Sequence, residues 1–225
     1  LFGGIAAYFN AANQNAELKR QLAATKTKLV ESQAQADENR RLKGLLGLAE
    51  VEPRPIAFAR LTGSSATSTR RFATLSAGSG DGVLIGMPVR SELGLVGRVL
   101  EVGTATSRVL LVTDGESVVP VRRALDGIAG FAQGRANGTL QIRLISLGIN
   151  PLKRGDAFVT SGSGGLYRPG TPIAVVESLT RDGAIARVLS DPAATDYVSV
   201  EPVWTPEVVI SAPSPGAAPS GPAQP

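Results

Sequence analysis

Apolar residues recur at helical spacing through the first fifty positions. Between residues 10 and 50 there is no proline, and the strong helix formers Ala, Gln, Lys, Glu and Leu dominate. Alternating steps of four and three residues trace a ladder that resembles a heptad seam, and its large aliphatic members are Leu18, Leu22, Leu29 and Leu46. A helix of about forty residues is on the order of 60 Å long, too long to fold back on a small domain. The pattern predicts a helical stalk or coiled coil over residues 1–50.

The same seam predicts where the chain self-associates. A protruding helix gives its apolar seam residues no other burial, so we expect pairing into a homodimer or a higher assembly through Leu18, Leu22 and Leu29. Asn15 and Asn39 also fall on the seam, where they would weaken the pairing while restricting its register. A long amphipathic helix that lies along its own domain remains the alternative.

Residues 56–209 have the short, alternating apolar pattern of β-strands. In residues 139–144, Leu, Ile and Leu alternate with Gln and Arg, so the apolar side chains would share one face. Asp-Gly and Asn-Gly pairs, which favour tight hairpins, separate the strand candidates; they begin at Asp81, Asp114, Asp126, Asn137 and Asp182. The spacing suits a sandwich or a barrel, and the absence of helical periods between strands argues against a parallel βαβ fold.

These segments predict a mainly β protein with an N-terminal α-helical stalk. About 150 residues of short strands exceed one small barrel, so we expect two small β-barrel domains. The turn-rich stretch from residue 122 to 134 suggests a first barrel over residues 51–125 and a second over residues 126–208. The boundaries are approximate, and the pattern leaves open whether one barrel is inserted in the other. Residues 209–225 are rich in Pro and Ala and predict a disordered tail.

The amino-acid composition excludes most types of catalytic residue. The 225 residues include no His and no Cys, which excludes imidazole bases, thiolate nucleophiles, zinc fingers and disulfides. Basic residues number 23 against 19 acidic ones, without a basic run, so we expect no nucleic-acid partner. No apolar run reaches the roughly 18 residues that cross a bilayer. Because the sequence starts at Leu1 rather than Met, we expect a piece of a longer protein, with residues 1–9 as the tail of a removed membrane anchor.

A serine–lysine pair is the one nucleophilic arrangement that the composition leaves. Lys153 is the only Lys after residue 50, and it would need to lie beside Ser161 or Ser163. A solvated Lys153 at a turn is the favoured interpretation. The carboxylates that belong to turns or strand ends suggest no two-carboxylate site; they are Asp114, Asp126 and Asp156.

A glycine-rich block over residues 155–170 invites comparison with a phosphate-binding loop. No Lys-Ser or Lys-Thr follows its last glycine, and Pro169 precludes an immediate helix. A tight bend or bulge between strands is the better interpretation. We therefore expect a protein that is not an enzyme, with no catalytic residue, cofactor, metal or small-molecule substrate.

Several blocks follow one another in an order that is more specific than any of them alone. Residues 38–48 end the helix with Glu-Asn, Leu and Leu-Leu, and first-half blocks lie at residues 82–89, 94–99 and 107–114. Residues 155–173 then bring Gly-Asp, Thr-Ser-Gly, Gly-Gly, Pro-Gly and Pro-Ile. In order and spacing these blocks resemble the rod shape-determining protein MreC family. The likeness covers roughly residues 38–203, with Ala174 as a departure where the family would have Gly.

The resemblance implies a function, a location and partners. It implies a single-pass protein of the bacterial inner membrane whose periplasmic part is a stalk plus two β-barrels. Such a protein would be a non-catalytic scaffold of the cell-elongation machinery that maintains rod shape by self-associating and organising peptidoglycan synthases. The implied partners are the transpeptidase penicillin-binding protein 2 (PBP2), the membrane protein MreD and, through them, the MreB filament. The sequence does not identify partner-binding residues.

Other classes of function also join helices or small barrels. A periplasmic membrane-fusion or efflux adaptor is the alternative, but it normally needs a helical hairpin between two lipoyl halves, and only one helix is predicted. An oligonucleotide-binding barrel would need aromatic stacking platforms on one sheet. Tyr167, Tyr197 and Trp204 are instead scattered along the chain.

Overall fold

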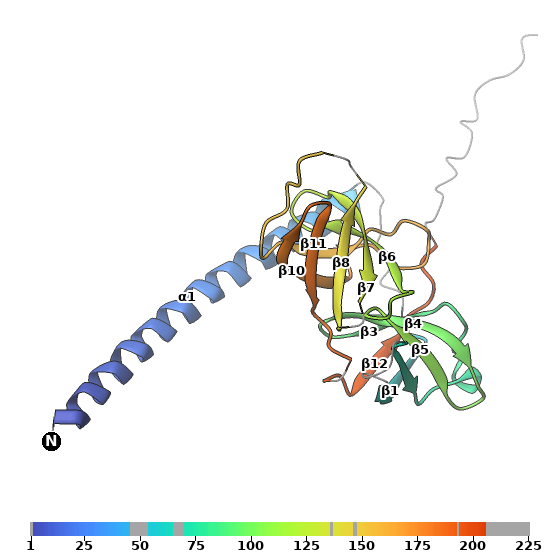
Figure 1. Cartoon of the computed structure of the whole chain (residues 1–225), viewed down its shortest axis with the longest axis horizontal. Coiled ribbons are helices and arrows are strands. Elements are labelled where there is room, and N and C mark those ends of the chain that lie inside the picture. The colour runs from blue at the N-terminus through green and yellow to red at the C-terminus, as the bar shows by residue number, and fades with distance from the viewer. Residues whose placement is uncertain are drawn as a thin grey trace, which may run out of the picture. The chain divides into compact units, whose positions relative to one another are not determined.

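The first unit of the chain is one long helix. Helix α1 spans Phe2–Leu45, 44 residues in all, and appears in blue in Figure 1. The computed structural model describes residues 2–45, 54–64, 70–135, 137–145, 148–192 and 194–205. Side chains from residue 14 to residue 35 are exposed. The helix predicted for the N-terminal part is confirmed; seam position Leu46 and residues 209–225 lie outside the described residues.

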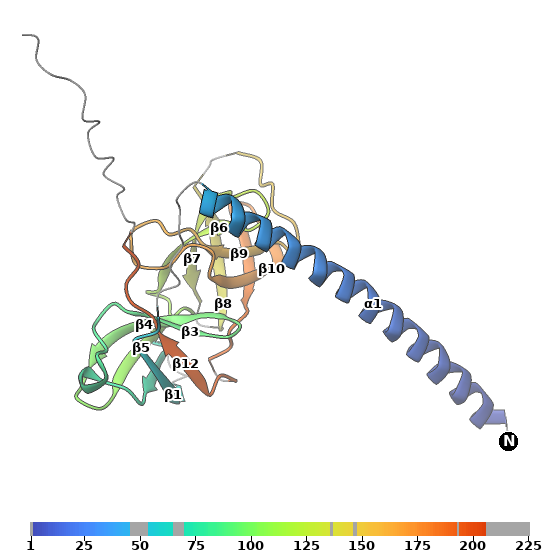
Figure 2. The same cartoon turned by 180° about the vertical axis from the view of Figure 1, so that it is seen from behind.

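The second unit contains two closed barrels whose neighbouring strands are all antiparallel. The first barrel closes in the order β1-β12-β3-β4-β5-β2. Its strands are β1 (Ala57–Ser64), β2 (Phe72–Leu75), β3 (Pro88–Ser91), β4 (Gly94–Val102), β5 (Ser107–Leu111) and β12 (Tyr197–Val200). A short 3₁₀ helix, η1 (Ser79–Asp81), lies between β2 and β3. Figure 2 shows β12, in orange-red, beside β1 among strands from the first half of the chain.

The second barrel closes in the order β10-β11-β8-β7-β6-β9. Its strands are β6 (Val118–Arg123), β7 (Ala129–Gly134), β8 (Thr139–Leu144), β9 (Ala157–Thr160), β10 (Pro172–Thr180) and β11 (Gly183–Val188). In β8, Leu140 and Ile142 are buried and Arg143 is exposed, as the alternation predicts. The largest fully buried side chain in this core is Phe158. The mainly β fold with two barrels is therefore confirmed.

The second barrel is inserted in the first, between β5 and β12. The sequence left this insertion open, but the approximate ranges 51–125 and 126–208 differ from the structure, because β6 belongs to the second barrel and β12 to the first. The turn-rich stretch near residue 122 is the β6–β7 hairpin, in which Arg122 pairs with Ala129, and not a linker. The chain crosses from the first barrel to the second between β5 and β6, and returns between β11 and β12. Among the described residues, no helix is both long enough and apolar enough to cross a bilayer.

Candidate functional site

The three seam leucines of α1 form one exposed stripe. Leu18, Leu22 and Leu29 are 64, 58 and 57% exposed. At about 100° per residue, they fall within about 40° of one another around the helix. Thr25 lies between them on the seam, and its hydroxyl donates to the carbonyl of Gln21 at 2.8 Å, so its polar group is satisfied within the helix. The stripe is narrow, but it is continuous and faces solvent.

Buried contacts join the two barrels where β4 meets β10. Gly94 begins β4 with a φ of +147°, and a Cβ added there would lie 2.3 Å from the carbonyl oxygen of Pro172. Only glycine permits this close backbone approach. The next residue, Leu95, is 2% exposed and packs in the core of the second barrel, although β4 belongs to the first. The barrels therefore share part of one hydrophobic core.

Both segments that cross between the barrels are tied by hydrogen bonds. Asp114 is fully buried in the outgoing crossing; its carboxylate accepts the backbone N–H of Arg71 at 2.5 Å and that of Glu116 at 2.9 Å. In the return crossing, the buried Ser190 hydroxyl lies 2.7 Å from the Ser91 hydroxyl of β3. Asp114 was predicted only to occupy a turn. In the structure it holds the crossing segment to the start of β2.

The glycine-rich block links β9 to β10 and reaches the first barrel. Its positive φ angles at Gly162, Gly164, Gly165 and Gly170 make the tight bend that the sequence predicts. Tyr167 is buried in the second core, and this burial raises its pKa to about 12, while Arg98 of β4 acts in the opposite direction. A Cβ on Gly86 of the first barrel would lie 3.8 Å from a methyl of Leu166. The block thus lies where the two barrels meet, which we call the joint.

A cavity of about 470 Å³ lies beside this joint and is lined by residues of both barrels. Arg71 and Thr113 line it from the first barrel and the outgoing crossing, and Glu177 and Arg187 from the second barrel. The Nε of Arg187 is 3.4 Å from the Oε1 of Glu177, so charges of opposite sign face each other in the wall. We assign no ligand to this cavity.

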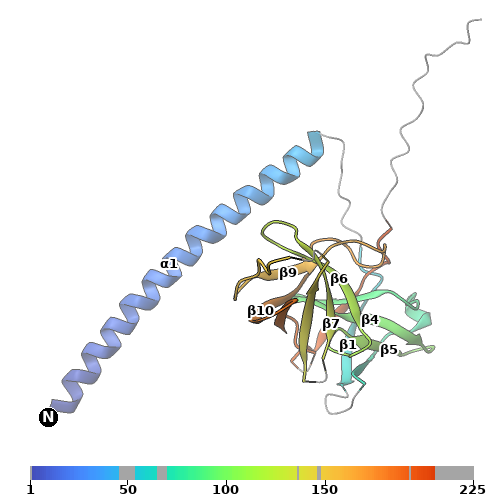
Figure 3. The same ribbon diagram turned by 45° about the horizontal axis from the view of Figure 1, so that its top comes forward.

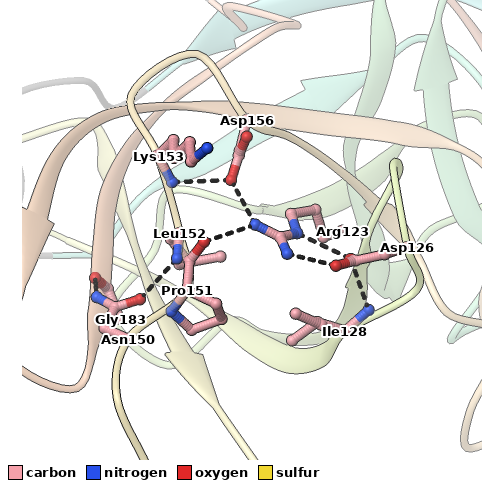
Figure 4. Close-up of polar contacts among 9 residues, drawn as sticks. All are labelled: Arg123, Asp126, Ile128, Asn150, Pro151, Leu152, Lys153, Asp156 and Gly183. Carbon is pink, nitrogen blue, oxygen red and sulfur yellow. Dashed lines mark hydrogen bonds and ion pairs between the residues drawn. The ribbon is translucent and has the colours of Figure 1, made fainter.

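Arg123 is the centre of a polar network at the other end of the second barrel (Figure 4). Its side chain is buried, and it donates to Asp126 from Nε at 2.8 Å and also from Nη2. Its Nη1 donates to Asp156 and to the carbonyl of Pro151, each at 2.9 Å. One guanidinium thus holds the β6–β7 turn to the β8–β9 connection.

The charges in this network stabilise one another. The hydrogen bonds to Asp126, and then those to Asp156, raise the pKa of Arg123 above its usual range. The bonds from Arg123 lower the pKa of Asp126. Burial by itself would raise the pKa of Asp156, but the Lys153 N–H and Arg123 outweigh it, and that pKa is lowered. Both carboxylates are therefore engaged as ion pairs, an arrangement that holds loops and offers no acid–base pair.

The sequence analysis did not identify Arg123 as a structural residue. The available signal was the alternation in β6, where Val119, Val121 and Arg123 point to the same buried face. The residues of the disfavoured serine–lysine pair do not lie together. Lys153 is exposed at one end of β9, and Ser161 and Ser163 follow its other end, about 13 Å away for four extended residues. Within the described residues, no cluster of acidic side chains is placed to hold a metal ion.

Two aromatic side chains are exposed on the outside of the first barrel. Phe58 of β1 and Tyr197 of β12 are 79 and 73% exposed, and both line a hollow of about 260 Å³ with Arg90. Phe58 pairs with Ser199 and Arg60 with Tyr197, so the aromatic residues lie on one face of adjacent strands. Aromatic and arginine side chains are typical of protein interfaces. This face is a second candidate surface for a partner.

Residues 61–204 match the family model described as rod shape-determining protein MreC, barrel core. The chain is 37% identical over 198 residues to the cell shape-determining protein MreC of Caulobacter vibrioides, covering 87% of this chain and 56% of that protein. It is 35% identical over 173 residues to the Escherichia coli protein of the same name, covering 75% of this chain and 46% of that protein. The chain thus spans about half the length of the curated relatives it matches.

Solved structures of the same name share the fold. The crystal structure of MreC from Pseudomonas aeruginosa is 28% identical, with a TM-score of 0.57 over 64% of this chain and 97% of that chain. A further similar structure is a complex between PBP2 and MreC from Helicobacter pylori, covering 64% of this chain and 98% of that chain. At 13% identity and a TM-score of 0.44, it assigns no residue of this chain to a partner.

Proposed function

The chain belongs to the rod shape-determining protein MreC family, and from this premise we propose that it is a non-catalytic scaffold that maintains cell shape. The observation that carries the proposal is the joint between the barrels. Leu95 is shared with the second core, and Asp114 and Ser190 tie the two crossing segments. Such a joint fixes two surfaces in one geometry, which is what a scaffold needs to position partners.

The scaffold self-associates through the exposed stripe of α1. Leu18, Leu22 and Leu29 are large aliphatic side chains on one side of a helix whose described side chains face solvent. Pairing of two helices would bury them as knobs in the partner's holes. Few large side chains contribute, so the pairing through α1 is weak and depends on each of them.

Replacement of the three seam leucines tests this self-association. Leu18→Asp, Leu22→Asp and Leu29→Asp together should shift the molar mass, measured by light scattering, from a dimer to the monomer mass of 23.2 kDa. The matched control places the same three charges at exposed positions on the opposite face of α1, as Ala16→Asp, Thr27→Asp and Ala34→Asp, and should leave the dimer intact. A dimer that survives the seam variant would move the interface to the barrels.

We propose PBP2 as the partner that links this scaffold to peptidoglycan synthesis, with MreD and, through them, the MreB filament in the same assembly. Family membership supports these partners, and so does a location on the periplasmic side of the inner membrane, where a single membrane span would anchor the protein. Phe58 and Tyr197 are the described side chains best suited to a protein contact, because they are aromatic, adjacent and exposed.

Crosslinking in cells tests the partners. Affinity isolation of the complete protein from crosslinked, detergent-solubilised cells should retrieve PBP2, and Phe58→Ser with Tyr197→Ser should reduce its yield. Leu84→Ser with Ile85→Ser removes two other exposed apolar side chains of the first barrel and serves as the control. Isolation of MreD without PBP2 would contradict the proposed link.

The alternative function is a periplasmic membrane-fusion or efflux adaptor. That class requires a helical hairpin between two halves of a lipoyl domain, whereas the described residues contain one long helix followed by two barrels, one inserted in the other. Family membership favours the scaffold over the adaptor.

A further inference from the structure

Four large aliphatic side chains are exposed at the end of the second barrel that lies away from the joint. The antiparallel strands bring the β6–β7, β8–β9 and β10–β11 connections to this end, which is turned forward in Figure 3. Three of these side chains lie on the connections and the fourth near the end of β10. Their exposed fractions are 84% for Leu125, 57% for Ile145, 97% for Ile149 and 53% for Leu179. We call these four residues the aliphatic tip.

Hydrogen bonds place the segments that carry the tip side by side. The N–H of Ile145 donates to the carbonyl of Ala129, just after the β6–β7 turn, at 3.2 Å. The side-chain amide of Asn150 donates to the carbonyls of Thr180 and Gly183 at 2.9 and 2.7 Å, which holds the β8–β9 connection beside the β10–β11 turn. The segments that carry the four side chains therefore lie side by side at this end of the barrel.

The Arg123 network fixes the backbone beneath this surface. Arg123 holds Asp126, which follows Leu125, and the carbonyl of Pro151, two residues after Ile149 (Figure 4). A loop whose backbone is already held loses little conformational entropy when its side chains bind something. The backbone next to Leu125 and Ile149 is thus already held before anything binds.

Exposed positive charges border the tip. Lys153, Arg154 and Arg181 are exposed on the same connections. Of the nearby carboxylates, Asp126 and Asp156 accept hydrogen bonds from Arg123, which leaves Asp182 as the acidic side chain on these described segments that is not part of the network. Aliphatic side chains surrounded by Lys and Arg match the surface of a bilayer with anionic headgroups.

The residue types favour a lipid surface over a protein partner. Energetically dominant protein contacts are enriched in Trp, Tyr and Arg, and Leu is under-represented among them. The described parts of the three connections contain no aromatic residue, and Leu125, Ile145 and Ile149 are exposed there. Phe58 and Tyr197, by contrast, lie on the first barrel.

We propose that the aliphatic tip docks on the surface of a phospholipid bilayer that carries anionic headgroups. Leu125, Ile149 and Leu179 enter the boundary between headgroups and acyl chains, and the three cations contact the headgroups. In this position the second barrel is held on the bilayer surface by its own loops, and the exposed aromatic face of the first barrel stays available to proteins.

Vesicle sedimentation with the full 225-residue chain tests the proposal. Wild-type protein should sediment with vesicles of phosphatidylethanolamine and phosphatidylglycerol in about a three-to-one ratio, and much less with phosphatidylcholine vesicles. Leu125→Ser, Ile149→Ser and Leu179→Ser together should weaken binding roughly tenfold or more. Lys153→Gln, Arg154→Gln and Arg181→Gln should each weaken it about fivefold, and raised salt should reduce the effect of all three.

The matched control replaces three similarly exposed aliphatic residues of the first barrel, as Leu84→Ser, Ile85→Ser and Leu93→Ser. Every variant keeps α1, so any vesicle binding by the helix is the same in all of them. Equal binding by the tip variant and this control variant would overturn the proposal. So would wild-type protein that fails to bind the anionic vesicles.

A fluorescent label gives a second measurement that does not depend on total binding. The chain has no cysteine, so Ile149→Cys carries a polarity-sensitive dye at one defined site, with Leu93→Cys as the control. Anionic vesicles should shift the emission of the dye to the blue at position 149 and leave it unchanged at position 93. A shift at neither position, or at position 93 alone, would overturn the proposal. Neither result alters the seam test of self-association, so the failure of one proposal is distinguishable from failure of the other.

Discussion

Leu95→Ala should weaken the contact between the barrels and leave the strand pairing that closes each barrel intact. Leu95 is 2% exposed and contributes to the second core from a strand of the first barrel. Truncation of a buried Leu to Ala removes transfer free energy and leaves a cavity, which together cost about 3 kcal/mol. For a unit of this size, that loss should lower the melting temperature by roughly 6–12 °C.

The location of Leu95 makes a more specific prediction than the loss of stability. Because the side chain couples the two barrels, its removal should separate their unfolding into two transitions in differential scanning calorimetry. Leu75→Ala truncates a fully buried side chain within the first core, so it should lower the free energy of unfolding by a similar amount. It should not separate the unfolding of the two barrels. Leu93→Ala, two residues from Leu95 but exposed, should change the free energy of unfolding by less than about 0.5 kcal/mol.

Calorimetry of these three variants decides the argument. If Leu95→Ala melts like Leu93→Ala, the side chain does not stabilise the fold. If it is destabilised but gives the same single transition as Leu75→Ala, Leu95 is an ordinary core residue and the barrels are coupled elsewhere. Either outcome would refute the role of Leu95 in coupling the barrels.

Two further predictions concern ionisable groups. Spectrophotometric titration should resolve a tyrosine with a pKa of about 12 that is lost in Tyr167→Phe. Because this pKa is higher in the folded state than in the unfolded state, the free energy of unfolding should fall as pH rises from 10 to 12. A free energy of unfolding that stays constant over this range would contradict the burial of Tyr167. The lowered carboxyl pKa values around Arg123 stabilise the fold above pH 3.8, the ordinary Asp value, and this contribution is lost as pH falls through the lowered values. Arg123→Met should therefore be less stable than the wild type at neutral pH and should lose less stability on acidification. Thermal melts in which the variant and the wild type depend on pH in the same way would refute the network. Arg122→Met is the control.

Local patterns in the sequence determined a large part of this protein. The absence of Pro and the leucine ladder of the N-terminal segment predicted α1, because helix formation depends on neighbours three and four residues apart. The alternation at Leu140 and Ile142 predicted the buried face of β8 in the same way. The glycine-rich block was correctly interpreted as a bend, since its positive φ angles are a local requirement.

Only the tertiary structure decided how the strands are distributed between the barrels. The pairing of β12 with β1 joins residues about 140 positions apart, and nothing in the local pattern of Tyr197–Val200 selects β1 as the neighbour. Leu95 lies in a strand of the first barrel, and nothing in its local pattern indicates that it enters the other barrel's core. Arg123 likewise meets Asp156 only when β6 and β9 pair. A two-residue period specifies which face of a strand is buried, whereas barrel closure depends on long-range pairing, and that pairing also set the positions of the joint, the Arg123 network and the aliphatic tip.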